Sequence, residues 1–93
     1  MLFVALLKAR SGSQEARIAR RTAWQLPSIP GLETVAEYWL QTLDPAAIAV
    51  FKAENIGQIW ALFTGWDDLF DISIYPAISA EDGLELLKQL PRQ

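Results

Sequence analysis

The sequence predicts one α+β domain in which a four-stranded antiparallel sheet carries helices on one face. Three observations predict it. The chain has 93 residues, enough for one hydrophobic core, so residues 1–93 are expected to form a single domain. Its hydrophobic pattern changes between the strand period and the helix period in the order βαββαβ, followed by a C-terminal helix. Two of the four strand segments are apolar on both faces, as central strands of a sheet are.

The first strand and the first helix are predicted over residues 2–26. Residues 2–9 are a continuous apolar run of strand length. The run Ser11-Gly12-Ser13-Gln14 then supplies helix-start chemistry, with a serine hydroxyl for an unpaired amide, and Glu15 is an acid in the first turn. Small and apolar side chains recur at spacings of three and four, which predicts an amphipathic helix; they are Ala16, Ala19, Ala23 and Leu26.

The second and third strands are predicted to form a hairpin. Residues 32–41 alternate with period two, residues 42–45 form a short turn, and residues 46–53 are nearly all apolar. The alternation places four side chains together on the mixed face of the second strand, Glu33, Glu37, Trp39 and Gln41.

The second helix is bounded by a capping box and a glycine. Asn55 and Gln58 have the N-x-x-Q spacing that caps a helix N-terminus, and Gly65 is suited to end the helix. The helical register predicts that four side chains form its core-facing stripe, Ile56, Ile59, Trp60 and Phe63. Trp66 is expected to join the same core cluster.

The fourth strand alternates over residues 69–75, with Asp71, Ser73 and Tyr75 on one face. Beyond it, Ser79 is the expected cap of a C-terminal helical tail over about residues 79–90. With right-handed crossovers this element order gives the ferredoxin-like fold, with strand order 4-1-3-2. Its helices cover one face of the sheet, so a second copy of the chain is the expected cover of the other face.

Composition excludes several classes of function. The chain has no cysteine and no histidine, which excludes disulfides, thiolate chemistry and the commonest zinc and haem ligands; we expect no metal and no cofactor. The net charge is −3 and the aromatic strand motif of RNA-recognition domains is missing, so no nucleic-acid partner is expected. The N-terminal apolar run is too short for a signal peptide or a membrane span, which predicts a cytoplasmic protein with no membrane partner.

Asp67, Asp68 and Asp71 spell D-D-x-x-D, the spacing at which helical aspartates hold magnesium against a diphosphate. That chemistry needs a helix, on which positions i and i+4 share a face. Here Gly65 ends the helix and a strand pattern follows. We therefore expect Asp67 and Asp68 in a solvated turn, and Asp71 alone in the strand.

The first helix carries a basic stripe that ends in an aromatic residue. Arg17, Arg20 or Arg21, and Trp24 lie at helical spacings, and Arg20 over Trp24 is a plausible cation–π pair. As a functional feature the stripe would hold an anionic ligand or RNA. The simpler interpretation, which we adopt as the expectation, is a solvated helix face.

Short motifs along the chain resemble an uncharacterised family of short prokaryotic proteins in the dimeric α+β barrel superfamily. They are the M-L-F opening, G-L-E at Gly31, an aromatic residue near the end of the second strand, W-x-D-L-x-D from Trp66 to Asp71, and the following Pro76. The likeness extends to about Ser79. It implies a homodimer with an internal cavity, but no particular activity. Superfamily members include cofactor-free oxygenases, haem-degrading enzymes, lyases and ligand binders, many of which depend on a histidine that this chain lacks.

The candidate site combines the two mixed faces across that dimer. If both faces look into the dimer interior, Glu37 and Asp71 of different subunits flank one cavity, and Trp39 and Tyr75 form its apolar walls. Ser73 lies on the same strand face as Asp71 and Tyr75. A carboxylate desolvated by aromatic rings there would have a raised pKa and act as a general acid or base. The simpler alternative is a pair of rim acids in contact with water or paired with Arg10 or Lys52.

Three functions are consistent with these residues. The first is a homodimeric binder of a small apolar or aromatic molecule, with Glu37, Trp39, Asp71, Ser73 and Tyr75 as ligand contacts. The second is a cofactor-independent lyase, isomerase or oxygenase that acts on an aromatic or polyketide-like substrate, with Glu37 or Asp71 as its acid or base. The third is a structural or regulatory dimerisation module.

Overall fold

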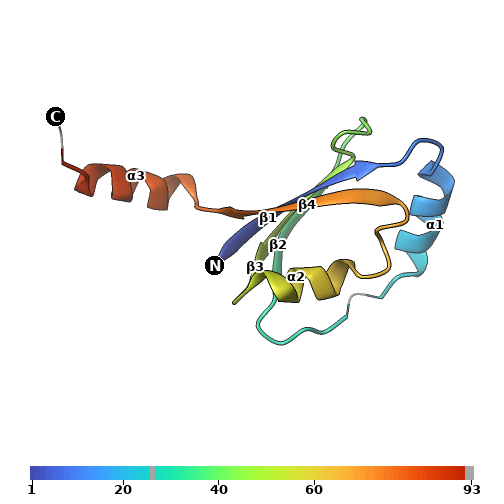
Figure 1. Cartoon of the computed structure of the whole chain (residues 1–93), viewed down its shortest axis with the longest axis horizontal. Helices are drawn as coiled ribbons and strands as arrows, with labels where there is room; N and C mark the ends of the chain where they lie inside the picture. The colour runs from blue at the N-terminus through green and yellow to red at the C-terminus, as the bar shows by residue number, and fades with distance from the viewer. Residues whose placement is uncertain (26, 92–93) are drawn as a thin grey trace.

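The computed structural model describes residues 1–25 and 27–91, and its elements follow the predicted order. Figure 1 shows them as a curved sheet with α1 and α2 on one side and α3 extending away from the rest. Their bounds are β1 Leu2–Ala9, α1 Gln14–Ala23, β2 Glu33–Trp39, β3 Ala47–Lys52, α2 Ile56–Phe63, β4 Phe70–Ala77 and α3 Ala80–Gln89. None of the helices in the described ranges is long and apolar enough to cross a membrane.

The sheet has the order β2-β3-β1-β4, which is the predicted 4-1-3-2 order read from the other edge. All three pairings are antiparallel. The two segments that are apolar on both faces, β1 and β3, are the central strands, as predicted. The small α+β fold with a four-stranded antiparallel sheet is therefore confirmed.

The core lies between the sheet, α2 and the segment from Trp66 to Phe70, and α1 contributes no buried residue to it. Phe3, Ala5 and Leu7 of β1 point into it, and β3 contributes Phe51 beside Phe3. Ile59 of α2 is fully buried against them. The alternate residues of the central strands, such as Val4 and Val50, lie on the opposite face, which no helix of the described chain covers and where they are only half-buried. We call this the open face.

The helix α1 is turned differently from the expectation. Ala16, Ala19 and Ala23 are exposed, whereas the arginines Arg17, Arg20 and Arg21 are half-buried and point inward. Leu26, the last member of the predicted apolar stripe, lies outside the described residues. Burying the methyl group of an alanine contributes little free energy. An arginine can bury its methylene groups against apolar surface while its guanidinium bonds to acids. The basic stripe is thus the packed side of α1, and the prediction of a solvated face is wrong.

The predicted capping box of α2 is confirmed. The Asn55 side chain accepts from the Gln58 amide, and the Gln58 side chain accepts from the Asn55 amide. The buried stripe is rotated from the prediction, because Ile59 and Leu62 are buried whereas Trp60 is 69% exposed. Ile56 is exposed as well, and Phe63 is half-buried. Gly65 follows the helix with φ +93°, as a helix stop requires.

A β-bulge in β2 changes which face its side chains occupy. Thr34 pairs with Phe51, but Ala36 pairs with Val50, so Val35 is an extra residue on this strand. An inserted residue moves every later side chain to the other face of the sheet. Glu37, opposite Ala49 in the pairing register, therefore lies on the helix-facing side, and so does Trp39, while Glu33 before the bulge lies on the open face. The prediction that Glu33, Glu37 and Trp39 share one face of this strand is therefore wrong.

The C-terminal end leaves the domain. The strand β4 continues through Pro76 to Ala77, which is tolerated because β4 is an edge strand. Ser79 then caps α3 by accepting from the Asp82 amide at 3.1 Å, as predicted. No residue of α3 is buried, and the radius of gyration is 15.7 Å. A compact chain of this length has about 12 Å, so the projecting helix makes the molecule elongated.

Candidate functional site

A cavity of about 400 Å³ lies between α1, the sheet and the end of α2. This volume is within the range of small-molecule sites, roughly 300–1,000 Å³. Ala47 and Ala49 of β3 form part of its floor, and their short side chains leave the space open. Aromatic side chains and three charged groups make up much of the wall, among them Arg17, Arg21, Trp24, Glu37, Trp39 and Trp66.

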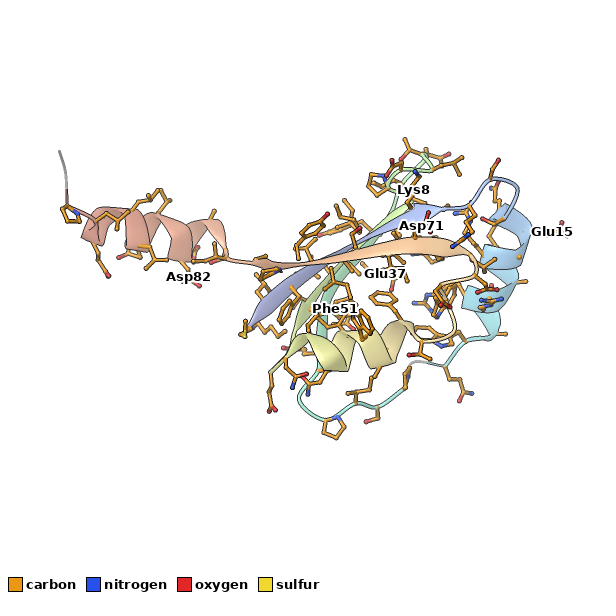
Figure 2. The ribbon with its side chains drawn as sticks, viewed as in Figure 1. Lys8, Glu15, Glu37, Phe51, Asp71 and Asp82 are labelled. Atoms are coloured by element: carbon orange, nitrogen blue, oxygen red, sulfur yellow. The ribbon has the colours of Figure 1, made fainter. Side chains whose placement is uncertain are left out.

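Glu37 is held at the cavity by two other side chains of the wall, Arg21 of α1 and Trp39 of its own strand. Arg21 donates to both of its oxygens, from Nη2 to Oε1 at 3.2 Å and from Nε to Oε2 at 3.4 Å. The indole Nε1 of Trp39 donates to Oε2 at 2.7 Å. These bonds tie α1 to the edge strand β2 and fix all three side chains where solvent reaches the cavity (Figure 2 labels Glu37).

The protonation of Glu37 differs from the expectation. Burial by itself would raise the pKa of this carboxyl, but the hydrogen bonds from Arg21 and Trp39, with the Arg21 charge, outweigh it. The pKa of Glu37 is therefore lower than its ordinary value, not raised. The group is ionised at neutral pH, so it is not available as a general acid.

Each inward arginine of α1 lies over an aromatic ring. The guanidinium carbon of Arg17 is 5.8 Å from the ring centre of Phe70, and that of Arg20 is 5.7 Å from the centre of Trp66. Arg21 lies 5.5 Å from Trp24. The sequence suggested a cation–π pair of Arg20 with Trp24. In the structure Arg20 instead lies over Trp66, and Arg21 lies over Trp24.

The aromatic rings beneath the arginines pack against one another. Trp24 and Trp66 meet edge to face at a centroid distance of 5.5 Å and an angle of 89°. Trp66 also contacts Phe70 at 5.9 Å. Such pairs add about 0.5–1.5 kcal/mol each beyond the area they bury, so they stabilise this wall. Trp66 is 6% exposed, which confirms its predicted place in the core.

The three aspartates of D-D-x-x-D have separate environments. Asp67 and Asp68 lie in the turn before β4, as predicted, and Asp71 lies in the strand. Arg20 binds Asp68 through both terminal nitrogens, with Nη2 2.9 Å from Oδ2, and this hydrogen bonding lowers the pKa of Asp68. Across residues 1–25 and 27–91, no cluster of three or more histidine, cysteine, aspartate or glutamate side chains is placed to hold a metal ion.

The strand β4 keeps its predicted mixed face but does not share it with Glu37. Asp71, Ser73 and Tyr75 pair with Lys8, Leu6 and Val4 of β1 on the open face, away from the cavity. Asp71 also accepts a hydrogen bond from Arg10 Nη2 at 3.0 Å. This ion pair agrees with the simpler sequence-based alternative, in which the acid is paired with Arg10 or Lys52. Of the five predicted ligand contacts, the structure brings only Glu37 and Trp39 to the cavity (Figure 2 also labels Asp71).

Sequence reasoning missed several cavity residues, namely Arg17, Arg21, Trp24 and Phe70. A signal for the first three was present, because they share one stripe of α1 at helical spacing. The alternative in which this stripe holds an anionic ligand places the site on the side where the cavity lies.

The comparisons with known proteins identify a family but no activity. No curated protein and no solved structure matches the chain. One family model, described as a domain of unknown function (DUF3303), matches residues 1–91. Because this match covers nearly the whole chain, the protein belongs to the DUF3303 family.

Proposed function

We propose that the protein binds a small, largely apolar molecule in the cavity between α1 and the sheet. The observation that carries the proposal is the cavity of about 400 Å³, walled by aromatic side chains and edged by a few charged groups. Ligand sites in proteins combine these features, because the apolar wall supplies affinity and a few polar groups fix orientation. The packed rings of Trp24, Trp66 and Phe70 support binding at a wall that is already formed without the ligand.

Two observations favour binding over proton-transfer catalysis. Glu37 has a lowered pKa and its oxygens already accept three hydrogen bonds, so it is a weak base and not an acid at neutral pH. Asp71, the other carboxylate candidate, lies on the open face and not in the cavity. The enzymatic alternative therefore has less support than the binding function.

The test uses tryptophan fluorescence, since Trp24, Trp39 and Trp66 line the cavity while the exposed Trp60 does not. The neutral aromatic probe N-phenyl-1-naphthylamine should quench this fluorescence and saturate. Trp60→Phe should keep the quenching, because it removes an emitter outside the site.

A cavity-filling variant completes the test. Thr34 is exposed and borders the cavity from β2, so Thr34→Phe should narrow the site without disturbing the core. We expect it to weaken probe binding at least about fivefold, a free-energy change near 1 kcal/mol. Loss of the quenching in Trp60→Phe, or unchanged affinity in Thr34→Phe, would place the probe elsewhere and contradict the proposal.

We also infer that the chain forms a homodimer through the open face. Val4, Val50 and their neighbours give this face an apolar centre that the chain itself does not cover. The resemblance to dimeric α+β barrels supports the same assembly. The cavity, on the other side of the sheet, is lined by one chain, so the two inferences are tested separately.

A further inference from the structure

The charges around the cavity are unbalanced. Arg17 and Arg21 line it together with Glu37, so two positive groups face one negative group and the formal sum is +1. Arg21 is paired with Glu37 at 3.2 Å. The excess positive charge of the cavity therefore resides on Arg17.

Arg17 differs from the other arginines of the described chain. Arg10, Arg20 and Arg21 each form a salt bridge with a carboxylate. Within residues 1–25 and 27–91, Arg17 has no carboxylate at salt-bridge distance. Its Nε donates to the Ser13 hydroxyl at 3.0 Å, and its terminal nitrogens make no hydrogen bond to any described residue.

The Arg17 side chain is nevertheless fixed in place. Ser13 is buried, and its hydroxyl both accepts from Arg17 and donates to the Arg10 carbonyl. A serine of residues 11–14 was expected to cap α1, but the Ser13 side chain makes no capping bond and holds the arginine instead. The guanidinium also lies 5.8 Å from the centre of the Phe70 ring. An arginine that is held in position without a counter-charge is prepared to bind an anion.

We propose that the cavity selects a molecule with an aromatic or apolar body and one anionic oxygen group, which Arg17 binds. The inference rests on the proposed binding function and adds the chemical class of the ligand. The planar, forked guanidinium suits a carboxylate, phosphate or sulfonate, which it contacts through two nitrogens. The body of the ligand lies against the wall formed by Trp24 and Trp66, and Arg17 fixes which end faces the first turn of α1.

Two dyes that share one ring skeleton distinguish the contribution of an anionic group to binding from that of the apolar body. They are 1-anilinonaphthalene-8-sulfonate, which carries a sulfonate, and the neutral N-phenyl-1-naphthylamine. Both are titrated into the full-length protein and followed by dye fluorescence. We expect the sulfonate dye to bind more tightly than the neutral dye, although it is the more soluble of the two.

Variants of α1 then assign the preference to Arg17. Arg17→Gln should weaken binding of the sulfonate dye about tenfold, and that of the neutral dye by less than about twofold, because only the charged contact is lost. Arg17→Lys should retain part of the preference, since it keeps the charge without the fork. Arg20→Gln is the matched control, because Arg20 lies on the same inward side of α1 but does not line the cavity, and it should change neither affinity.

The outcomes distinguish the two proposals. If neither dye binds the wild-type protein, the proposed binding function fails, and the anion preference with it. If both dyes bind equally and Arg17→Gln leaves both affinities unchanged, the binding function stands and the anion preference is wrong. An equal loss for both dyes in Arg17→Gln would assign the arginine a packing role only and would also overturn the inference.

Discussion

Glu37 accepts hydrogen bonds from Arg21 of α1 and from Trp39 of its own strand, so one carboxylate links a helix to a sheet edge. Its environment combines partial burial with two donors, and the donors lower its pKa in spite of the burial. A group whose pKa is lower in the folded protein contributes stability above its unfolded pKa. That contribution disappears as the pH falls through the folded value.

The first prediction concerns the pH dependence of this link. Glu37→Gln should lower the free energy of unfolding at pH 7 by less than about 1 kcal/mol, because the pair is partly exposed and screened by solvent. The difference between wild type and variant should shrink once the pH falls below the ordinary glutamate pKa of about 4.3 and towards the lowered value. Urea denaturation at a series of pH values measures it.

Glu33→Gln is the control for this prediction. Glu33 is an exposed residue of the same strand, on the open face, and it forms no salt bridge within the described residues. Its replacement should change stability little at any pH in the series. A difference for Glu37→Gln that stays constant down to pH 3, or grows there, would contradict the assigned link.

At the level of elements, two capped helices have different roles in stability. The capping box of α2 starts a helix whose Ile59 and Leu62 are buried in the core. The cap of α3 at Ser79 starts a helix that buries no residue. Removing a cap affects global unfolding only where the helix is packed on the rest of the fold.

The second prediction follows from this contrast. Asn55→Ala should lower the free energy of unfolding by about 0.5–2 kcal/mol, the usual effect of losing a helix cap. Ser79→Ala should leave the unfolding of the isolated subunit unchanged, although it lowers the helix content of α3. Thermal unfolding followed by tryptophan fluorescence, which reports the domain and not α3, makes the comparison. Equal losses in both variants would mean that α3 is packed on the domain.

The elements also show how far the sequence could predict the site. β1 and the capping box of α2 could be predicted because they depend on local sequence pattern. The strand order could be predicted because it follows from the element order and the handedness of the crossovers. The bulge at Val35 could not be predicted in this way, because it depends on pairing with β3. One inserted residue moved Glu37 and Trp39 to the opposite face and so relocated the site.

The orientation of α1 was missed for an energetic reason. A pattern of alanines and arginines is usually interpreted with the charged side outward, since charge is costly to bury. Here Arg20 and Arg21 have carboxylate partners, and their guanidinium groups lie over the rings of Trp66 and Trp24. Asp68, Glu37 and Trp66 come from other parts of the chain, so the sequence of α1 alone does not reveal these partners.

At the scale of the whole molecule, apolar side chains lie on two surfaces that the described chain does not cover. Val4 lies at the centre of the open face, between Val50 and Tyr75 in the pairing register. The projecting α3 adds a second apolar surface, with Leu84, Leu86 and Leu87 all more than half exposed. Apolar side chains grouped on one surface are typical of protein interfaces.

The third prediction tests self-association through the open face of the sheet. The wild-type protein should sediment as a dimer at micromolar concentration, and Val4→Glu should sediment as a monomer, because a charge at the centre of an apolar interface loses its hydration. Ala16→Glu adds the same charge at an exposed site of α1, and it should remain dimeric. A monomeric wild-type protein, or a dimeric Val4→Glu, would contradict the assignment of the interface.

The same variant relates assembly to binding. The cavity lies on the helix-facing side and is lined by residues of one chain, whereas Val4 lies on the open face. Monomeric Val4→Glu should therefore bind N-phenyl-1-naphthylamine with an affinity within about twofold of wild type, a difference below 0.5 kcal/mol. If the affinity falls with the dimer while the unfolding midpoint is kept, the partner subunit contributes to the site. The cavity of a single chain would then be only part of the binding surface.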